Sequence, residues 1–139
     1  MKINIFGSTG EIGSKSLYII NKYFPKIKIN LLVANNNYKK LIKQIKIYNP
    51  RYVYINNEKA ISKIQKKIKP LKTKILLKDE IENHLSSSFV DLTILSISGY
   101  QALYYFNFII KNTKYLGLVN KETIVSAGHL FNKIFKKNK

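Results

Sequence analysis

The chain has 139 residues, with 25 Lys+Arg against 7 Asp+Glu, no cysteine and no tryptophan. This length fits one domain, and the absence of cysteine excludes disulfides, thiolate metal sites and cysteine nucleophiles. The formal net charge of +18 suggests nucleic-acid binding, but Arg51 is the only arginine, and base and phosphate recognition favours the guanidinium group. We therefore expect no nucleic-acid partner and interpret the lysine excess as a solvated surface.

Short β-branched runs alternate with helix-periodic segments along the chain. The predicted strands are residues 3–6, 27–33, 52–55, 74–77, 90–95 and 115–119. Between them, four predicted helices carry apolar residues at helical spacing: Leu17, Ile20 and Phe24; Leu41, Ile45 and Tyr48; Ile61, Ile64 and Ile68; and Leu103, Phe106 and Ile110. This alternation predicts a doubly wound α/β fold, in which a parallel sheet has helices on both faces.

Three further expectations concern an edge of the sheet, membranes and the location of the protein. The lysine-rich stretch 59–78 is expected at an edge of the sheet, as a solvated helix and strand. No run of 18 apolar residues occurs, so we expect no membrane-spanning helix and no membrane partner. Because the sequence contains no recognisable signal or transit segment, we expect a cytoplasmic location.

Residues 2–14 have the pattern of a strand that runs into a glycine-rich turn and then into a helix. Gly7, Gly10 and Gly13 follow one another at three-residue intervals. Glycines allow a pyrophosphate to approach the backbone, and the amino terminus of a helix offers N–H groups to it. The simpler interpretation is a tight turn with no ligand, but the flanking strand and helix favour a dinucleotide site. A Walker phosphate loop is excluded, because no Gly-Lys-Ser/Thr follows.

The end of the second predicted strand indicates which dinucleotide is bound. An NAD-selective site places an acidic residue there to hold the ribose 2′-hydroxyl. This chain instead has Asn35, Asn36 and Asn37, followed by Lys39 and Lys40. With no carboxylate to repel a 2′-phosphate, NADP(H) is the preferred cofactor. Asparagines also favour turns, and both interpretations can hold together.

Two later loops follow predicted strands at the edge where open parallel sheets bind ligands. The first is residues 96–99, and the second contains Asn120, Lys121 and Glu122. Lys121 could hold a substrate phosphate while its neighbours orient the cofactor. Alternatively, Asn120 caps a helix and the two charges that follow are solvated.

Four segments, in order and spacing, resemble the amino-terminal NADPH-binding domain of the 1-deoxy-D-xylulose 5-phosphate reductoisomerase family. They are Gly-Ser-Thr-Gly-Glu-Ile-Gly at 7–13, Leu-Val-Ala-Asn-Asn-Asn at 32–37, Asn-Pro-Arg-Tyr at 49–52, and Val-Asn-Lys-Glu-Thr-Ile-Val-Ser-Ala-Gly at 119–128. The resemblance implies a homodimeric oxidoreductase of isoprenoid biosynthesis. Its enzymes isomerise 1-deoxy-D-xylulose 5-phosphate with a divalent metal, Mg or Mn, and reduce the intermediate with NADPH to 2-C-methyl-D-erythritol 4-phosphate.

The resemblance also implies roles for individual positions. Around the cofactor pyrophosphate it places the glycine-loop residues Thr9, Gly10, Glu11 and Ile12, and around the 2′-phosphate it places Asn35, Asn36 and Asn37. Asn120 and Glu122 would contact NADPH, and Lys121 the sugar phosphate. The family usually has serine at the position of Glu11 and lysine at the position of Asn36. A carboxylate near a pyrophosphate is repulsive unless it points to solvent, and Lys39 or Lys40 is the candidate substitute for the missing lysine.

The family's metal-binding carboxylates and catalytic loop belong to a second domain, which begins with an Asp-Ser-Glu motif. That motif does not occur in this sequence. We therefore expect residues 1–139 to form an NADPH-binding domain that has no catalytic residue or metal ligand and cannot complete the reaction alone. The alternative is a non-catalytic dinucleotide-binding or sensing domain. A short-chain dehydrogenase is disfavoured, because its Tyr-x-x-x-Lys motif occurs only at Tyr18 and Lys22, within the first predicted helix.

Overall fold

The computed structural model describes residues 1–99, 101–119, 121 and 125. Within them, six strands and five α-helices alternate, with one 3₁₀ turn. The strands are β1 (Lys2–Phe6), β2 (Lys28–Ala34), β3 (Tyr52–Ile55), β4 (Lys74–Leu76), β5 (Val90–Leu95) and β6 (Thr113–Leu118). The helices are α1 (Glu11–Tyr23), α2 (Tyr38–Tyr48), α3 (Ile61–Ile68), α4 (Lys78–Ser87) and α5 (Gln101–Ile109), and the 3₁₀ turn η1 (Glu58–Ala60) precedes α3.

The strands form one parallel sheet in the order β4-β3-β2-β1-β5-β6. From β1 the chain builds outward through β2 and β3 to β4, and then crosses back to place β5 on the other side of β1. The carboxyl ends of β1 and β5 therefore flank the point where the strand order reverses, which is where open α/β sheets bind ligands. β4 lies at one edge, as the lysine-rich stretch predicted.

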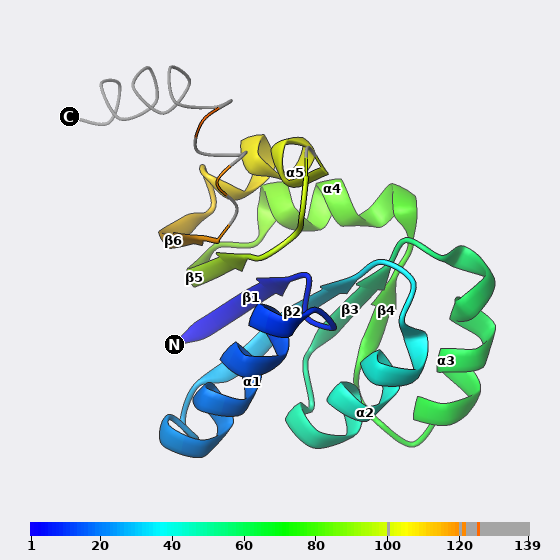
Figure 1. Ribbon diagram of the computed structural model, residues 1–139. Coiled ribbons are helices and arrows are strands. Elements are labelled where there is room, and N and C mark those ends of the chain that lie inside the picture. The colour runs from blue at the N-terminus through cyan, green and yellow to red at the C-terminus, as the bar shows by residue number, and fades with distance from the viewer. Residues whose placement is uncertain (100, 120, 122–124, 126–139) are drawn as a thin grey trace.

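Helices cover both faces of the sheet (Figure 1). Alternate strand residues point to opposite faces, so Ile3 and Ile5 pack with α1, α2 and α3, whereas Phe6 packs with α4 and α5. The two faces form separate cores that share the sheet. The predicted doubly wound α/β fold is confirmed.

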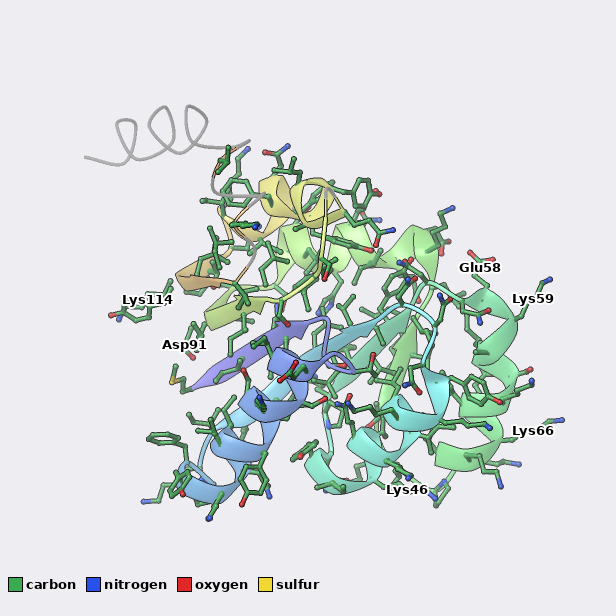
Figure 2. All side chains as sticks on the ribbon, viewed as in Figure 1. Lys46, Glu58, Lys59, Lys66, Asp91 and Lys114 are labelled. Atoms are coloured by element: carbon green, nitrogen blue, oxygen red, sulfur yellow. The ribbon has the colours of Figure 1, made fainter. Side chains whose placement is uncertain are left out.

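The lysines of α2, η1 and α3 point away from these cores. Figure 2 shows Lys46, Lys59 and Lys66 extending from the outer side of these elements, and all three side chains are exposed. In the described part of the chain, no helix is both long enough and apolar enough to cross a membrane.

The helix α4 is not among the helices predicted from the sequence. This helix buries only Ile81 and Leu85 in an otherwise polar stretch, so its apolar periodicity is weak. Its start is fixed by Glu80, whose carboxylate accepts a hydrogen bond from the Leu77 N–H at 2.9 Å. Acidic first-turn residues such as Asp79 and Glu80 were the sequence signal for this helix.

Two predicted core faces also need correction. Phe24 was expected in the core, but it follows the last turn of α1 and is 54% exposed. In α5 the buried positions are Ala102, Tyr105, Phe106 and Ile109. Of the predicted set, Phe106 is buried, Ile110 follows the helix and is partly buried against the same core, and Leu103 is half-buried. A helix that is apolar on most sides, as α5 is, leaves its orientation to the packing against the sheet.

Candidate functional site

The loop between β1 and α1 needs glycine at two positions for steric reasons. Gly7 has φ +75°, and a Cβ there would lie 2.5 Å from the Ser96 carbonyl oxygen. A Cβ on Gly13 would lie 2.3 Å from the Gly7 carbonyl oxygen and 2.7 Å from Ser8 Cα. Gly10 is less crowded, with one neighbouring atom at 3.2 Å, and it occupies the amino-terminal cap of α1. The loop is therefore a tight turn, as the simpler interpretation required, and it brings the backbone of α1 close to β1 and β5.

Hydrogen bonds hold this loop in one conformation. The N–H groups of Gly7 and Ser8 donate to the Val33 carbonyl at 2.9 and 3.0 Å, which fixes the loop to the end of β2. The Gly10 N–H donates to the Gly7 carbonyl at 3.0 Å. The first helical hydrogen bond of α1 runs from Ser14 to Gly10, so the N–H groups of residues 11–13 have no helical acceptor. They lie at the positive end of the helix dipole, where an anion is stabilised.

A cleft opens beside the loop at the carboxyl ends of the strands. It has a volume of about 260 Å³, and its lining comes from the glycine loop, the end of β2, the residue after β3 and the segment after β5: Gly7, Thr9, Gly10, Val33, Ala34, Asn35, Asn56, Ser96, Ile97, Ser98 and Gln101. A second hollow of about 440 Å³ shares Gly10 and residues 96–98, and continues toward Glu11, Ile12, Val119 and Lys121. We refer to the two together as the switch-point cleft.

Taken singly, neither hollow of the switch-point cleft is the largest in the described part of the chain. A hollow of about 510 Å³ lies between η1 and α4, lined by residues that include Glu58, Asp79 and Glu82. It contains none of the glycine-loop residues. We assign function to the switch-point cleft because it combines the glycine loop, unpaired helix N–H groups and the point of strand reversal.

The three asparagines after β2 have different structural roles. Asn37 caps α2, since its Oδ1 accepts from the Lys40 N–H at 3.0 Å. Asn35 is tied to the residues after β3, with its Oδ1 accepting from Asn56 Nδ2 at 3.3 Å and its carbonyl from the Asn57 N–H at 3.0 Å. Asn36 is exposed and lies between them. The turn interpretation is therefore right for Asn37, and Asn36 has the amide most available to a ligand.

Glu11 does not leave an isolated charge in the cleft. Its carboxylate lies 2.6 Å from the Lys15 ammonium, one turn further along α1. The hydrogen bond from Lys15 and its positive charge hold the pKa of Glu11 below its usual value. Glu11 is thus ionised and paired at the mouth of the second hollow.

The predicted residues of the last loop are only partly covered by the structure. Lys121 is exposed and lines the second hollow together with Glu11. Asn120 and Glu122 lie outside the described residues. Among the residues that the structure describes, no three His, Asp or Glu side chains come together as a metal-binding group.

Two residues of the cleft are not among those predicted from the sequence. Asn56 follows β3, and Gln101 begins α5, yet both line the cleft with Asn35. Their sequence positions carried one usable signal, because each follows a predicted strand at its carboxyl end. Which strands are neighbours was the information that the sequence lacked.

Comparison with known proteins identifies the family. The model of 1-deoxy-D-xylulose 5-phosphate reductoisomerase matches residues 3–128. The chain belongs to this family. Among curated reductoisomerases, that of Pelagibacter ubique is 39% identical over 140 residues, which cover 99% of this chain and 36% of the relative. The apicoplastic reductoisomerase of Plasmodium falciparum is 34% identical, with coverage of 100% and 30%.

Solved reductoisomerases have the same fold. The reductoisomerase of Zymomonas mobilis, solved in complex with NADPH, superposes with a TM-score of 0.86 at 24% identity, covering 98% of this chain and 36% of that chain. A reductoisomerase solved with NADPH, fosmidomycin and magnesium gives a TM-score of 0.85 at 26% identity, covering 99% and 34%. The chain therefore spans about a third of the length of these relatives. The family resemblance and the Rossmann-like fold predicted from the sequence are both confirmed.

Proposed function

We propose that the chain forms the NADPH-binding part of a 1-deoxy-D-xylulose 5-phosphate reductoisomerase. The observation that carries the proposal is the glycine loop at the point of strand reversal, with its unpaired α1 N–H groups and no acidic residue at the end of β2. Reductoisomerases of the same fold have been solved with NADPH.

The glycine loop fits the pyrophosphate of the cofactor. A side chain at Gly13 would collide with the loop backbone, and Gly7 allows the turn that brings α1 to the cleft. The N–H groups of residues 11–13 would then bind the phosphate oxygens. Glu11 would remain beside the phosphates with its charge compensated by Lys15.

The adenosine half of NADPH would occupy the part of the cleft beside Ala34 and Asn35. The 2′-phosphate would lie against the exposed Asn36, with the exposed Lys39 supplying the positive charge that the family's usual lysine provides. The nicotinamide half would extend into the second hollow, toward Lys121, which would contact the sugar phosphate. Bound NADPH supplies the hydride for the reductive half of the reaction. We propose that Asn120 and Glu122 also contact NADPH.

The isomerisation of 1-deoxy-D-xylulose 5-phosphate needs more than this part of the enzyme. A solved relative holds magnesium, whereas the described residues of this chain offer no metal-binding group. We assign the metal-dependent step to the part of the family's enzymes that lies outside the match with this chain. The complete enzyme would be a cytoplasmic homodimer that forms 2-C-methyl-D-erythritol 4-phosphate.

A cofactor switch tests this proposal. Asn36→Asp introduces the acidic group that NAD-selective sites use, so it should weaken NADPH binding and strengthen NADH binding. Asn21→Asp, which adds the same charge at an exposed position near the carboxyl end of α1, away from the asparagines that follow β2, is the control and should leave the ratio of the two affinities unchanged. If Asn36→Asp leaves that ratio unchanged as well, the 2′-phosphate does not lie at this position.

A further inference from the structure

Gln44 is a buried polar residue on the inner face of α2. The buried residues of α2 are Leu41, Gln44 and Ile45, and only 5% of the Gln44 surface is exposed. Its Nε2 donates a hydrogen bond to the carbonyl oxygen of Ser8 at 2.7 Å, across 36 positions of sequence. The buried side of α2 is thus joined to the glycine loop by one side-chain amide.

This arrangement is energetically unfavourable if Gln44 only fills space in the core. The Oε1 of Gln44 and the Oγ of Ser8 are buried and have no hydrogen-bond partner among the described residues. A buried polar atom without a partner destabilises the folded state, and an apolar side chain of the same length would avoid that cost. Violations of local packing rules concentrate at functional sites, so the glutamine points to a role beyond the core.

The hydrogen bond fixes one peptide plane of the loop. The Ser8 carbonyl also accepts from Ser14 Oγ at 3.1 Å, while the Ser8 N–H donates to Val33 at 3.0 Å. In a trans peptide the C=O and the following N–H point in opposite directions. Holding the Ser8 carbonyl toward α2 therefore turns the Thr9 N–H away from Gln44, and Thr9 lines the switch-point cleft.

The same helix begins at the other end of the proposed cofactor site. Asn37 caps α2 next to Asn36, and Gln44 lies about two turns further along the helix. A helix is rigid over this length, so α2 joins the asparagines at the proposed 2′-phosphate position to the loop at the proposed pyrophosphate position. At the first end the Lys40 N–H donates to Asn37 Oδ1 and caps α2, and further along Gln44 Nε2 donates to the Ser8 carbonyl and ties α2 to the loop.

We propose that Gln44 is a positioning residue for the dinucleotide. It orients the Ser8–Thr9 peptide toward the pyrophosphate and sets the spacing between the pyrophosphate and the 2′-phosphate subsites. The inference rests on the proposed function of the cleft as an NADPH site. Gln44 acts only through Ser8 and α2.

Binding of two ligands to the full chain separates this role from a structural one. Gln44→Met keeps the length of the side chain and removes the donor. We expect it to weaken NADPH binding about tenfold, the scale of one lost hydrogen bond. It should leave adenosine 2′-monophosphate, which lacks the pyrophosphate, within about twofold. Ile45→Val, a buried change in the adjacent position, should leave the affinities for both ligands within about twofold.

Equal weakening of both ligands, or unchanged binding of both with a lower melting temperature, would overturn the positioning role. A second measurement needs no variant: in the wild-type chain, the Thr9 amide resonance should shift with NADPH and not with adenosine 2′-monophosphate. No shift of Thr9 on NADPH binding contradicts the proposal. Failure of the wild-type chain to bind NADPH at all would instead refute the proposed function, and this inference with it.

Discussion

Glu11 and Lys15 form an ion pair on the first turns of α1, with the carboxylate oxygen 2.6 Å from the ammonium nitrogen. Glu11 lines the second hollow and is one of the first-turn residues whose N–H groups are proposed to bind the pyrophosphate, so the pair lies beside that site. The helix dipole stabilises a carboxylate in the first turn of a helix. An acidic residue four positions before a lysine is also the order in which such a pair stabilises the helix more. The Glu11 carboxylate therefore stabilises the start of α1, and Lys15 shields its negative charge from an incoming phosphate.

Removing the lysine should expose that repulsion. We expect Lys15→Ala to weaken NADPH binding by about twofold to fivefold at low salt, and less as salt is raised, because both side chains are exposed and screened. Titration of NADPH at two ionic strengths measures the effect. Lys22→Ala, in the last turn of α1, is the matched control and should change the affinity less. An equal effect of both variants would mean that only overall charge matters.

Gly13→Ala should disrupt the loop and the cofactor site together. The new Cβ would lie 2.3 Å from a backbone oxygen, so the loop must move or α1 must shift. We expect a loss of about 1–3 kcal/mol in the free energy of unfolding and loss of measurable NADPH binding. Gly117→Ala is the control, because a Cβ there would lie 3.8 Å from the nearest atom, the Thr93 carbonyl oxygen. Urea unfolding and NADPH titration of both variants check this; tight NADPH binding by Gly13→Ala would contradict it.

His84 should make stability depend on pH. Its ring lies 4.3 Å from the Tyr52 ring and its Nε2 is buried with no hydrogen-bond partner among the described residues. Burial, and then the charges of Arg51 and Lys74, lower the pKa of His84 from its usual 6.5, while Glu80 opposes them. The folded state thus binds this proton more weakly than the unfolded state does.

The sign follows from linkage. Stability from the neutral His84 is fully present above pH 6.5 and is lost as the pH falls through 6.5 toward the lower pKa of the folded state. We expect the free energy of unfolding to decrease over this range in the wild-type chain, and His84→Phe to reduce that decrease. Denaturant unfolding at several pH values measures it. An identical pH dependence in both proteins would show that His84 is not responsible.

The chain supplied with 1-deoxy-D-xylulose 5-phosphate, NADPH and manganese should not oxidise NADPH. Its described residues hold no metal-binding group, and the proposed metal-dependent step precedes reduction. Loss of NADPH absorbance over time is the measurement. Oxidation at rates typical of an enzyme would show that this chain carries the whole chemistry.

The strands of the sheet could be predicted from the sequence because parallel strands are buried on both faces. Such strands consist of short runs rich in apolar and β-branched residues, as at residues 52–55 and 90–95. The glycine loop was also visible, since glycine at 7 and 13 has a steric cause that leaves a sequence pattern. α4 was missed because it buries only two apolar residues.

The residues that line or support the cleft could not all be predicted from the sequence. Asn56 and Gln101 meet at the cleft only because β5 crosses back beside β1, and strand order is a property of the folded chain. The contact between Gln44 and Ser8 is hidden for the same reason, because a glutamine on the inner side of α2 has no local sequence signature.

The central claim is that the cleft selects a dinucleotide with a 2′-phosphate. Titration of the wild-type chain with NADPH and with NADH, under the same conditions, tests it most directly. We predict that NADPH binds at least about tenfold more tightly, as expected for a site where a phosphate gains an amide and a lysine in place of a carboxylate. Equal affinity for the two cofactors, or binding of neither, would contradict the account.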